Sequence, residues 1–266
     1  MIRLRPAISS RKVSVALAAL LLLVVLAACT ASCGGTTGSG SGADSVYQVS
    51  TLGALAKGVM VGNTTCGELV KHGDLGLGTF NAMDGEMVVL DGAVYQVPVS
   101  GVPRKMKTGE LTPFAEVKFF KTLERWSVPK EANLDELKKN IDSRLPTRNY
   151  VYAFRLDGTF DHIKARSVPE QKPPFPSLEK VVAEQVVFEL SNVKGTMVGF
   201  FYPDYLAGVN QAGYHFHFLT DDRKAGGHVL DCAVNSASAK MDQASGLEMV
   251  FPETAEFKTV DIPGQN

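Results

Sequence analysis

Short runs of apolar side chains, either alternating with polar residues or standing together, recur along the chain from residue 45 onward. Such runs, when bounded by Gly, Pro, Asn and Asp, are typical of β-strands. The pattern predicts strands at residues 87–90, 93–97, 115–120, 150–155, 186–190 and 196–202. We therefore expect the body of the chain to be rich in β-structure.

Two segments instead show the apolar spacing of a helix. Leucine and isoleucine recur every three or four residues over 134–145, Asn133 can cap this segment, and Pro146 ends it. Ser177 can cap a second, shorter helix that continues to Val182. Few helices among many strands predict an α+β fold with mixed or antiparallel sheets, and not a doubly wound parallel sheet.

A segment with four prolines, at residues 169–176, interrupts the body. It predicts a boundary between an N-terminal β-rich half at 45–170 and a C-terminal β-rich half at 171–266. Residues 78–81 and 199–202 are loosely alike and stand before comparable two-strand units. This likeness hints at an internal duplication.

The N-terminal segment carries the signals of export. Basic residues up to Lys12 precede an apolar run that ends at residue 28 and is short for a membrane span of about 20 residues. The run closes with Leu-Ala-Ala before Cys29, which is similar to a bacterial lipobox. This similarity implies a signal peptide at 1–28 and a lipid on Cys29; an uncleaved anchor is the alternative. Either places the chain on a membrane, facing outside the cytoplasm, with the Gly/Ser/Thr-rich segment 29–44 as a flexible tether.

The charge balance argues against nucleic acid as a partner. The chain has 27 Lys and Arg against 28 Asp and Glu, a formal net charge of -1, and no basic run in its body. Binding to nucleic acid requires a cationic surface that neutralises phosphates.

Two of the four cysteines, Cys66 and Cys232, lie in the body. Disulfides form in exported proteins, so these two can pair. Two buried free thiols are an equally simple arrangement, and the sequence leaves both open.

The clearest chemical signal is a group of three histidines near the C-terminal end. His215 and His217 are two residues apart, so on a strand their side chains point to the same face. A turn over 220–227 would place His217 opposite His228. Three converging imidazoles with no fourth ligand nearby in sequence favour a zinc site with an open, catalytic coordination position. The alternative is three ordinary polar residues on the solvent face of a hairpin.

Other catalytic motifs are missing from the sequence. The glycine-rich segment 73–78 lacks the Lys-Ser/Thr ending of a phosphate loop and the strand-loop-helix context of a dinucleotide site. There is no G-x-S-x-G elbow and no H-E-x-x-H helix.

Five segments resemble, in the same order, motifs of the alpha-acetolactate decarboxylase family. They are GLGTFNAMDGEM at 76–87, KARSVP at 164–169, GTMVG at 195–199, GYHFHF at 213–218 and GGHVL at 226–230. The resemblance implies an α+β fold of two β-rich parts, and a homodimer whose interface cannot be read from the sequence. It also implies a zinc-dependent carboxy-lyase that converts (S)-2-acetolactate, a 2-hydroxy-3-oxo acid, to (R)-acetoin and carbon dioxide.

The resemblance also implies roles for single residues. By position, the family's zinc ligands, active-site glutamate, active-site arginine and a pocket threonine correspond to His215, His217 and His228, Glu86, Arg166 and Thr79. Without the resemblance, the glutamate would be interpreted as a hairpin-turn carboxylate and the arginine as a solvated strand residue.

One departure from the family concerns a second glutamate. Family members commonly have a further C-terminal segment that carries this glutamate back to the metal. The present sequence ends at Asn266, and Glu248, Glu253 and Glu256 do not stand at the matching place. The three expectations are that the segment is absent, that another carboxylate replaces it, or that activity is weakened.

Two other functions fit the same residues. An open zinc site can activate water, as in a zinc hydrolase of small anionic substrates. A non-catalytic surface lipoprotein could use the histidines to bind a metal or a small acid. An arginine that grips a carboxylate favours the decarboxylase, because a hydrolase requires a longer groove.

Overall fold

A computed structural model describes residues 44–262 of the chain. The predicted signal peptide at 1–28, the predicted lipid-carrying Cys29 and all of the predicted tether except Asp44 lie outside the described residues. Between residues 44 and 262, no helix is long and apolar enough to cross a membrane.

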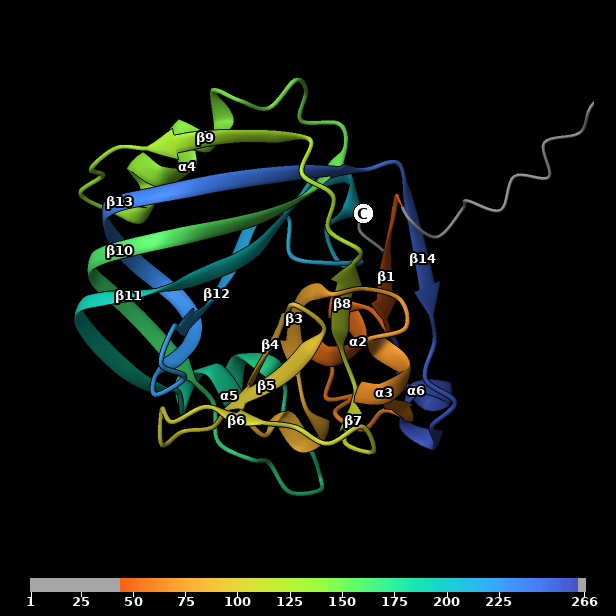
Figure 1. The fold of residues 1–266 in the computed structure, drawn as a ribbon. Helices are drawn as coiled ribbons and strands as arrows, with labels where there is room; N and C mark the ends of the chain where they lie inside the picture. Colours follow the sequence, from red (N-terminus) through yellow and green to blue (C-terminus); the bar gives the residue numbers. More distant parts are fainter. Residues whose placement is uncertain (1–43, 263–266) are drawn as a thin grey trace, which may run out of the picture. The chain divides into compact units, whose positions relative to one another are not determined.

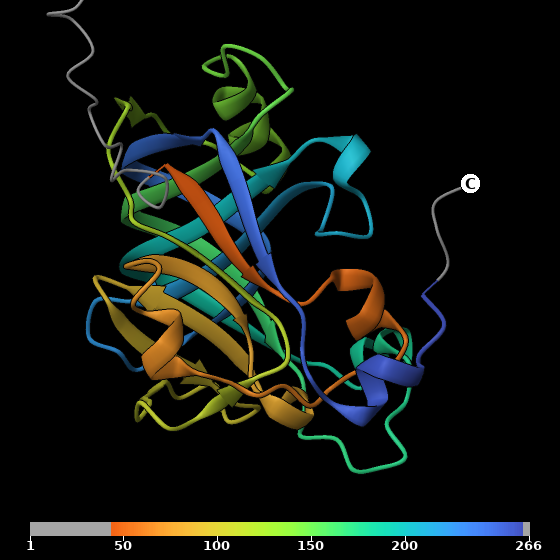
Figure 2. The same ribbon diagram turned by 90° about the vertical axis from the view of Figure 1, so that its right-hand side faces the viewer.

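Seven strands form the first sheet (Figure 1). In spatial order they are β14 (Gly246–Val250), β1 (Ser45–Val49), β8 (Ala115–Lys118), β3 (Leu75–Thr79), β4 (Glu86–Leu90), β5 (Ala93–Val97) and β6 (Arg104–Lys105). The β1–β14 pair is parallel, and all other neighbours are antiparallel. Figure 2 shows β1 in orange-red beside β14 in blue, so strands from both ends of the described chain meet in this sheet.

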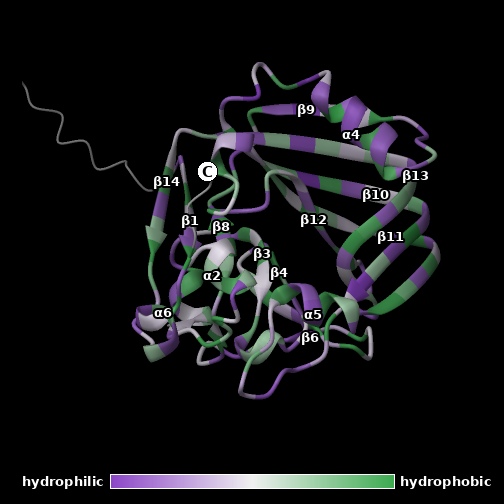
Figure 3. Cartoon of the chain, turned by 180° about the vertical axis from the view of Figure 1, so that it is seen from behind, coloured by the Kyte–Doolittle hydropathy of each residue, from purple (hydrophilic) through white to green (hydrophobic). Residues whose placement is uncertain are grey.

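Five strands form the second sheet. Their order is β10 (Val151–Ser167), β11 (Val186–Tyr202), β12 (Gly213–Thr220), β13 (Gly226–Ala244) and β9 (Glu124–Val128), with antiparallel pairing throughout. Because β10 also pairs with β13, the strands β10, β11, β12 and β13 form a closed ring in which each strand is hydrogen-bonded to the next. Hydrophobic and hydrophilic residues alternate along the long strands, as Figure 3 shows, so that one face of each strand is buried.

Shorter elements complete the fold. β2 (Thr64–Thr65) and β7 (Leu111–Thr112) form a two-stranded sheet. The helices are α2 (Leu52–Ala56), α3 (Cys66–Leu69), α4 (Leu134–Asp142), α5 (Leu178–Ala183) and α6 (Ala255–Thr259), with 3-10 turns η1 (Asn81–Met83) and η2 (Asp204–Leu206). Helices α2, α3, α4 and α6 are each capped at the N-terminus by a side-chain oxygen that accepts a hydrogen bond from a backbone N–H of the first turn. The capping residues are Thr51, Thr65, Asn133 and Thr254, respectively.

An apolar cluster joins the two large sheets. It combines side chains of β3 and β4 with side chains of β10, β11 and β12, among them Leu77, Val88, Val198 and Phe200. Thr79 pairs with Glu86 two residues beyond the Leu77–Val88 pair, so all four side chains share one face of the first sheet. The adjacent ends of β3 and β4 therefore turn polar groups toward the second sheet.

The predicted α+β class is confirmed, and several predicted elements coincide with observed ones. β5 has the predicted bounds, and β4 begins one residue early. Helix α4 begins at Leu134 as expected but ends at Asp142, short of the predicted 145. Helix α5 follows Ser177, although that side chain makes no capping hydrogen bond.

The two strands predicted at 186–190 and 196–202 are one continuous strand, β11. The intervening residues Ser-Asn-Val-Lys-Gly are mostly polar and exposed, so they interrupt the apolar pattern from which the two strands were predicted. Their pairing with β10 continues on both sides of Asn192, and this pairing keeps the segment extended.

The predicted boundary near residue 170 is not observed. Strands β9 and β10 precede it in sequence, yet β10 pairs with β11 and β13, and β9 pairs with β13, which follow it. The described residues 44–262 fall within one compact unit, and no division into halves at 45–170 and 171–266 is seen among them. The two sheets also differ in strand order, which gives the suggested duplication no support.

The two body cysteines are free and buried, so the disulfide alternative is not observed. Cys66 packs in the apolar cluster beside α3, whereas Cys232 packs in a different cluster inside the second sheet. Burial raises the pKa of Cys66 to about 11 and that of Cys232 to about 12, so both thiols stay protonated and unreactive.

Candidate metal centre and active site

Three histidine side chains converge where the two sheets meet. His215 and His217 project from β12, and His217 pairs with His228 on β13, so the predicted hairpin register is confirmed. The Nε2 atoms of His215 and His217 lie 3.2 Å apart. The Nδ1 atom of His228 lies 3.0 Å from the first of these and 3.3 Å from the second. A solvent-facing hairpin is excluded, because His217 is only 1% exposed.

A backbone contact from the first sheet sets the tautomer of one histidine. The Nδ1–H group of His217 donates to the carbonyl oxygen of Met87 on β4, at 2.7 Å. The Nε2 atom of His217 therefore carries a lone pair directed at the other two rings. The Nδ1 atom of His215 is buried without a hydrogen-bond partner.

The three imidazoles are neutral in this environment. Burial lowers the pKa of His215 to about 3, and the positive charge of Arg166 acts in the same direction. Burial also lowers the pKa of His217 and of His228 well below the usual value. Neutral imidazoles present lone pairs, which is the form that binds metal.

The geometry of the three nitrogens fits a metal ion. Their ligand atoms all lie within 4.8 Å of one another. In a tetrahedral site with zinc–nitrogen bonds of about 2.0 Å, neighbouring ligand atoms are about 3.3 Å apart. The observed separations of 3.0 to 3.3 Å match this value. A divalent cation between the three nitrogens would be bound by their lone pairs at these distances, so the set suits a divalent metal with a further position open.

Glu86 lies next to the histidines at the start of β4. Its Oε2 atom is 3.5 Å from Nε2 of His217, and its carboxylate is almost fully buried. Burial raises the pKa of Glu86 to about 7, while the charge of Arg166 opposes this rise. The structure therefore places the predicted glutamate beside the candidate metal centre.

The turn before Glu86 fixes the direction of its side chain. Gly85 has a φ of +79°, and an added Cβ would lie 2.5 Å from the carbonyl oxygen of Val97. Only glycine fits this conformation and approach. The hydroxyl of Thr79 donates to the carbonyl oxygen of Gly85 at 2.8 Å. The predicted pocket threonine thus braces the turn and also lines the site.

Arg166 reaches the same point from the second sheet. It lies near the end of β10, where it is the cross-strand partner of His228 on β13. Its Nη1 atom is 3.0 Å from Oε1 of Glu86, and its side chain is only 12% exposed. A guanidinium held here offers several N–H donors to a bound carboxylate.

Five of the predicted residues, Thr79, Glu86, Arg166, His215 and His228, line a small pocket of about 90 Å³. His217 lies buried behind this wall. Besides the predicted residues, its wall includes apolar side chains that the sequence did not single out, namely Leu52, Leu55, Met83, Phe114 and Leu178. Two of these come from α2 and one from α5, the helices that pack together beside the site. The sequence carried only a weak signal for them, because α2 is a five-residue helix without a long apolar repeat.

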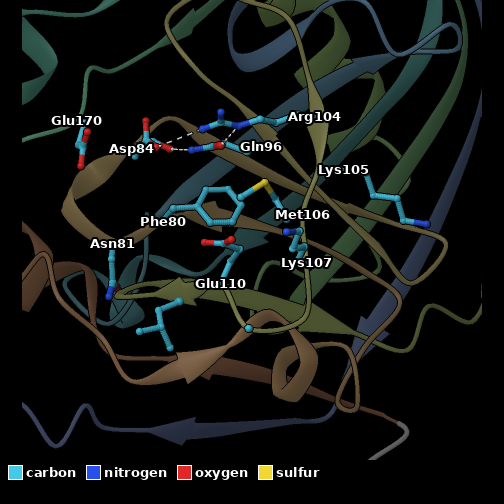
Figure 4. A pocket seen from close by; sticks show the side chains of 12 residues that line it. Phe80, Asn81, Asp84, Gln96, Arg104, Lys105, Met106, Lys107, Glu110 and Glu170 are labelled. Carbon is cyan, nitrogen blue, oxygen red and sulfur yellow. Dashed lines mark hydrogen bonds and ion pairs between the residues drawn. The ribbon is translucent and has the colours of Figure 1, made fainter.

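A larger hollow, of about 570 Å³, is lined in part by Asn81 and Asp84, which precede Glu86 in sequence (Figure 4). Its lining mixes acidic, basic and apolar residues and includes no histidine. On its wall Arg104 donates to Gln96, and Gln96 donates to the carbonyl oxygen of Asp84. Size alone would favour this hollow, but the ligand geometry and the buried charges favour the smaller pocket.

None of the three C-terminal glutamates lines the small pocket. Glu248, Glu253 and Glu256 are all exposed. Among the described residues, the histidine cluster that could hold a metal includes no carboxylate from this part of the chain.

The fold and site define a class: a two-sheet α+β protein with a largely buried three-histidine centre flanked by a carboxylate and an arginine. A family model described as alpha-acetolactate decarboxylase matches residues 46–263. The chain therefore belongs to the alpha-acetolactate decarboxylase family, as the sequence motifs predicted. Members of this family are decarboxylases, so the chain is a member of a carboxy-lyase family.

Individual relatives agree with this assignment. The chain is 44% identical to an alpha-acetolactate decarboxylase of Methanosarcina mazei over 228 residues, which is 86% of this chain and 79% of the relative. It is 36% identical to that of Bacillus subtilis over 217 residues, covering 82% of this chain and 85% of the relative. A crystal structure of the Bacillus subtilis protein superimposes with a TM-score of 0.81 at 34% identity, covering 83% of this chain and 94% of that one.

Proposed function

We propose that this protein decarboxylates (S)-2-acetolactate to (R)-acetoin and carbon dioxide, with zinc held by His215, His217 and His228. The observation that supports this most strongly is the convergence of three neutral imidazole nitrogens beside Glu86 and Arg166. Family membership supplies the substrate class.

The substrate defines what the site must do. Acetolactate carries a carboxylate, a tertiary hydroxyl and a neighbouring ketone. When the bond to the carboxylate carbon breaks, its electron pair stays on the substrate and forms an enediolate. A divalent metal bound by the three histidines would supply Lewis-acid stabilisation of this negative charge.

Arg166 is the residue that orients the carboxylate. Its guanidinium can hold both carboxylate oxygens through parallel N–H donors. Arg166 is ion-paired with Glu86 at 3.0 Å, so the carboxylate of a bound substrate would share the guanidinium of Arg166 with Glu86. This arrangement would align the breaking bond close to the histidine centre.

Glu86 is the residue that delivers the proton. After carbon dioxide leaves, the enediolate carbon must gain one proton on one face to give a single enantiomer. The carboxyl of Glu86 projects from one side only, held by its strand and by Thr79 through Gly85. A proton donor fixed in this way favours one product configuration.

The shape of the pocket favours a decarboxylase over the two other functions. A volume of about 90 Å³ suits a small acid and offers no long groove for a hydrolase substrate. A protein that only binds metal has no need of the buried Glu86–Arg166 pair, since burying such charges is costly.

We also propose that the chain works outside the cytoplasm, anchored to the membrane through a lipid on Cys29, and that it forms a homodimer. Replacing Cys29 with Ser should release the protein from the membrane fraction without changing its activity. Light scattering of the purified protein would give its mass in solution; a monomer would remove the dimer from the proposal.

The function is tested by incubating the purified protein with racemic 2-acetolactate and separating the products on a chiral column. The expected product is (R)-acetoin, formed together with an equal amount of carbon dioxide. A zinc-containing protein that forms no acetoin would refute the proposal.

A further inference from the structure

A cluster of buried polar side chains lies between the two sheets, apart from the histidine centre. It consists of Gln48 on β1, Glu116 on β8, Tyr202 on β11 and Asn210 in the segment between η2 and β12, none more than 1% exposed. The amide Nδ2 of Asn210 donates to Oε1 of Gln48 at 2.8 Å and to Oε2 of Glu116 at 3.0 Å. The hydroxyl of Tyr202 donates to the same Gln48 oxygen at 3.4 Å.

Glu116 is the residue of this cluster whose burial is least favourable in free energy. Its Oε1 atom is buried without a hydrogen-bond partner. Burial raises the pKa of Glu116 to about 8, although hydrogen bonds from Tyr202 and Asn210 act against the rise. A carboxyl group buried at this cost requires an explanation beyond packing, because an apolar side chain would fill the space more favourably.

Asn210 connects the cluster to the wall of the pocket. Its Oδ1 atom accepts the backbone N–H of Gln211 at 2.6 Å, and Gln211 lines the pocket together with His215 and His228. The side chain of Glu116 thus fixes the amide whose other end holds the backbone of a pocket residue.

Hydrogen bonds also hold the two residues before Asn210, namely Gly208 and Val209. The carbonyl oxygen of Val209 accepts hydrogen bonds from the side chain of Gln48 and from the backbone N–H of Leu52. The carbonyl oxygen of Gly208 accepts from Gly53 at 2.8 Å. Residues 207–211, which belong to no strand or helix, are therefore held between β1 and α2, whose Leu52 also lines the pocket.

We propose that Glu116 is a positioning residue for substrate binding, acting through Asn210 to hold residues 207–211 and Gln211 against the pocket. Among the described contacts, none joins Glu116 to Glu86, Arg166 or a histidine, so its effect falls on binding and not on the bond-breaking step. The proposal rests on the proposed function, because its main readout is turnover of acetolactate.

The test compares Glu116→Ala, Glu116→Gln, Gln211→Ala and the double variant Glu116→Ala/Gln211→Ala. Glu116→Ala should raise KM roughly tenfold, the equivalent of one buried hydrogen bond, with kcat and zinc content unchanged. Glu116→Gln should restore KM, because the amide oxygen can still accept from Asn210. Gln211→Ala should raise KM to a similar extent, and the double variant should show no further rise. An unchanged KM in Glu116→Ala, or multiplying effects in the double variant, would overturn the proposal.

A matched control separates positioning from loss of stability. Ile141 is fully buried on α4 and contacts neither the polar cluster nor the pocket, so Ile141→Ala should destabilise the protein without changing KM. If Ile141→Ala raised KM as much as Glu116→Ala does, the KM effect would be one of general stability and the proposal would fail.

A second readout does not depend on catalysis. Hydrogen exchange of the backbone amides over 206–212 should quicken in Glu116→Ala, relative to the rest of the protein, and remain slow in Glu116→Gln. Slow exchange in Glu116→Ala would refute the positioning role even if the protein decarboxylates acetolactate. Fast exchange in a protein without decarboxylase activity would instead refute only the proposed function.

Discussion

His217 and His228 are cross-strand partners in the β12–β13 hairpin, and their Nε2 and Nδ1 atoms lie 3.3 Å apart. The turn that joins the two strands sets this register, and the carbonyl oxygen of Met87 fixes which nitrogen of His217 faces the centre. A residue of the first sheet therefore orients a proposed metal ligand on the second. The proposed metal centre depends on the packing of the sheets as well as on the hairpin.

Replacing His217 with Ala should remove metal and activity together. The variant loses one of three ligand nitrogens, and the two that remain cannot form a stable site. We expect activity to fall by about 100-fold or more, with zinc well below one per chain by atomic absorption. An active, zinc-replete His217→Ala protein would show that this histidine is not a ligand.

Replacing Glu86 with Gln should separate metal binding from turnover. The amide fills the same space beside His217 but cannot donate a carboxyl proton, so kcat should fall roughly 10²- to 10⁴-fold. Zinc content, measured in the same sample, serves as the control and should stay at the wild-type level. Full activity in Glu86→Gln would remove Glu86 from the mechanism.

Replacing Arg166 with Lys tests the carboxylate clamp. Lysine keeps the positive charge but loses the planar fork that can bind both carboxylate oxygens. We expect kcat/KM to fall roughly 10- to 100-fold, as for the loss of a charge-assisted hydrogen bond. Wild-type kinetics in Arg166→Lys would mean that charge alone, and not the fork, holds the substrate.

A buried ion pair away from the pocket should control stability. The Nζ atom of Lys118 lies 2.7 Å from Oδ2 of Asp242, with side-chain exposures of 0% and 7%. Asp242→Ala would leave the lysine charge buried, so unfolding by urea should show a loss of about 3–5 kcal/mol. The exposed pair of Lys71 and Glu68 is the control, and Lys71→Ala should change the unfolding midpoint little, because water and salt screen this pair. Equal effects of the two variants would contradict this assignment.

The ionisation of Glu116 should make the free energy of unfolding depend on pH. Its pKa is about 8 in the folded protein, against 4.5 for an ordinary glutamate, so the folded state binds the proton more tightly. Its contribution to stability is therefore full below about pH 4.5 and is lost as pH rises toward 8. Glu116→Gln lacks this titration, so its stability relative to wild type should increase from pH 5 to pH 8. A difference that does not vary with pH would contradict the raised pKa.

The sequence was sufficient for the parts of the site that depend on local spacing. The two-residue interval between His215 and His217, with a turn before His228, predicted the hairpin and its register correctly. Glu86 and Arg166 were placed by motif likeness, because nothing local shows that residues 80 positions apart form an ion pair.

The rest depends on long-range packing that spacing does not encode. The apolar wall from α2 and α5, the Met87 carbonyl and the Glu116–Asn210 contact all join segments distant in sequence. The predicted boundary near residue 170 was not observed because prolines there mark only a connection, while β10 on one side pairs with β11 on the other.

The decisive measurement is a zinc titration of the metal-free protein with acetoin formation followed at each step. We predict no turnover without metal, a linear rise as zinc is added, and saturation at one zinc per chain. Turnover that is independent of added zinc and resistant to chelation, or saturation with metal but no acetoin, would contradict decarboxylation at the three-histidine centre.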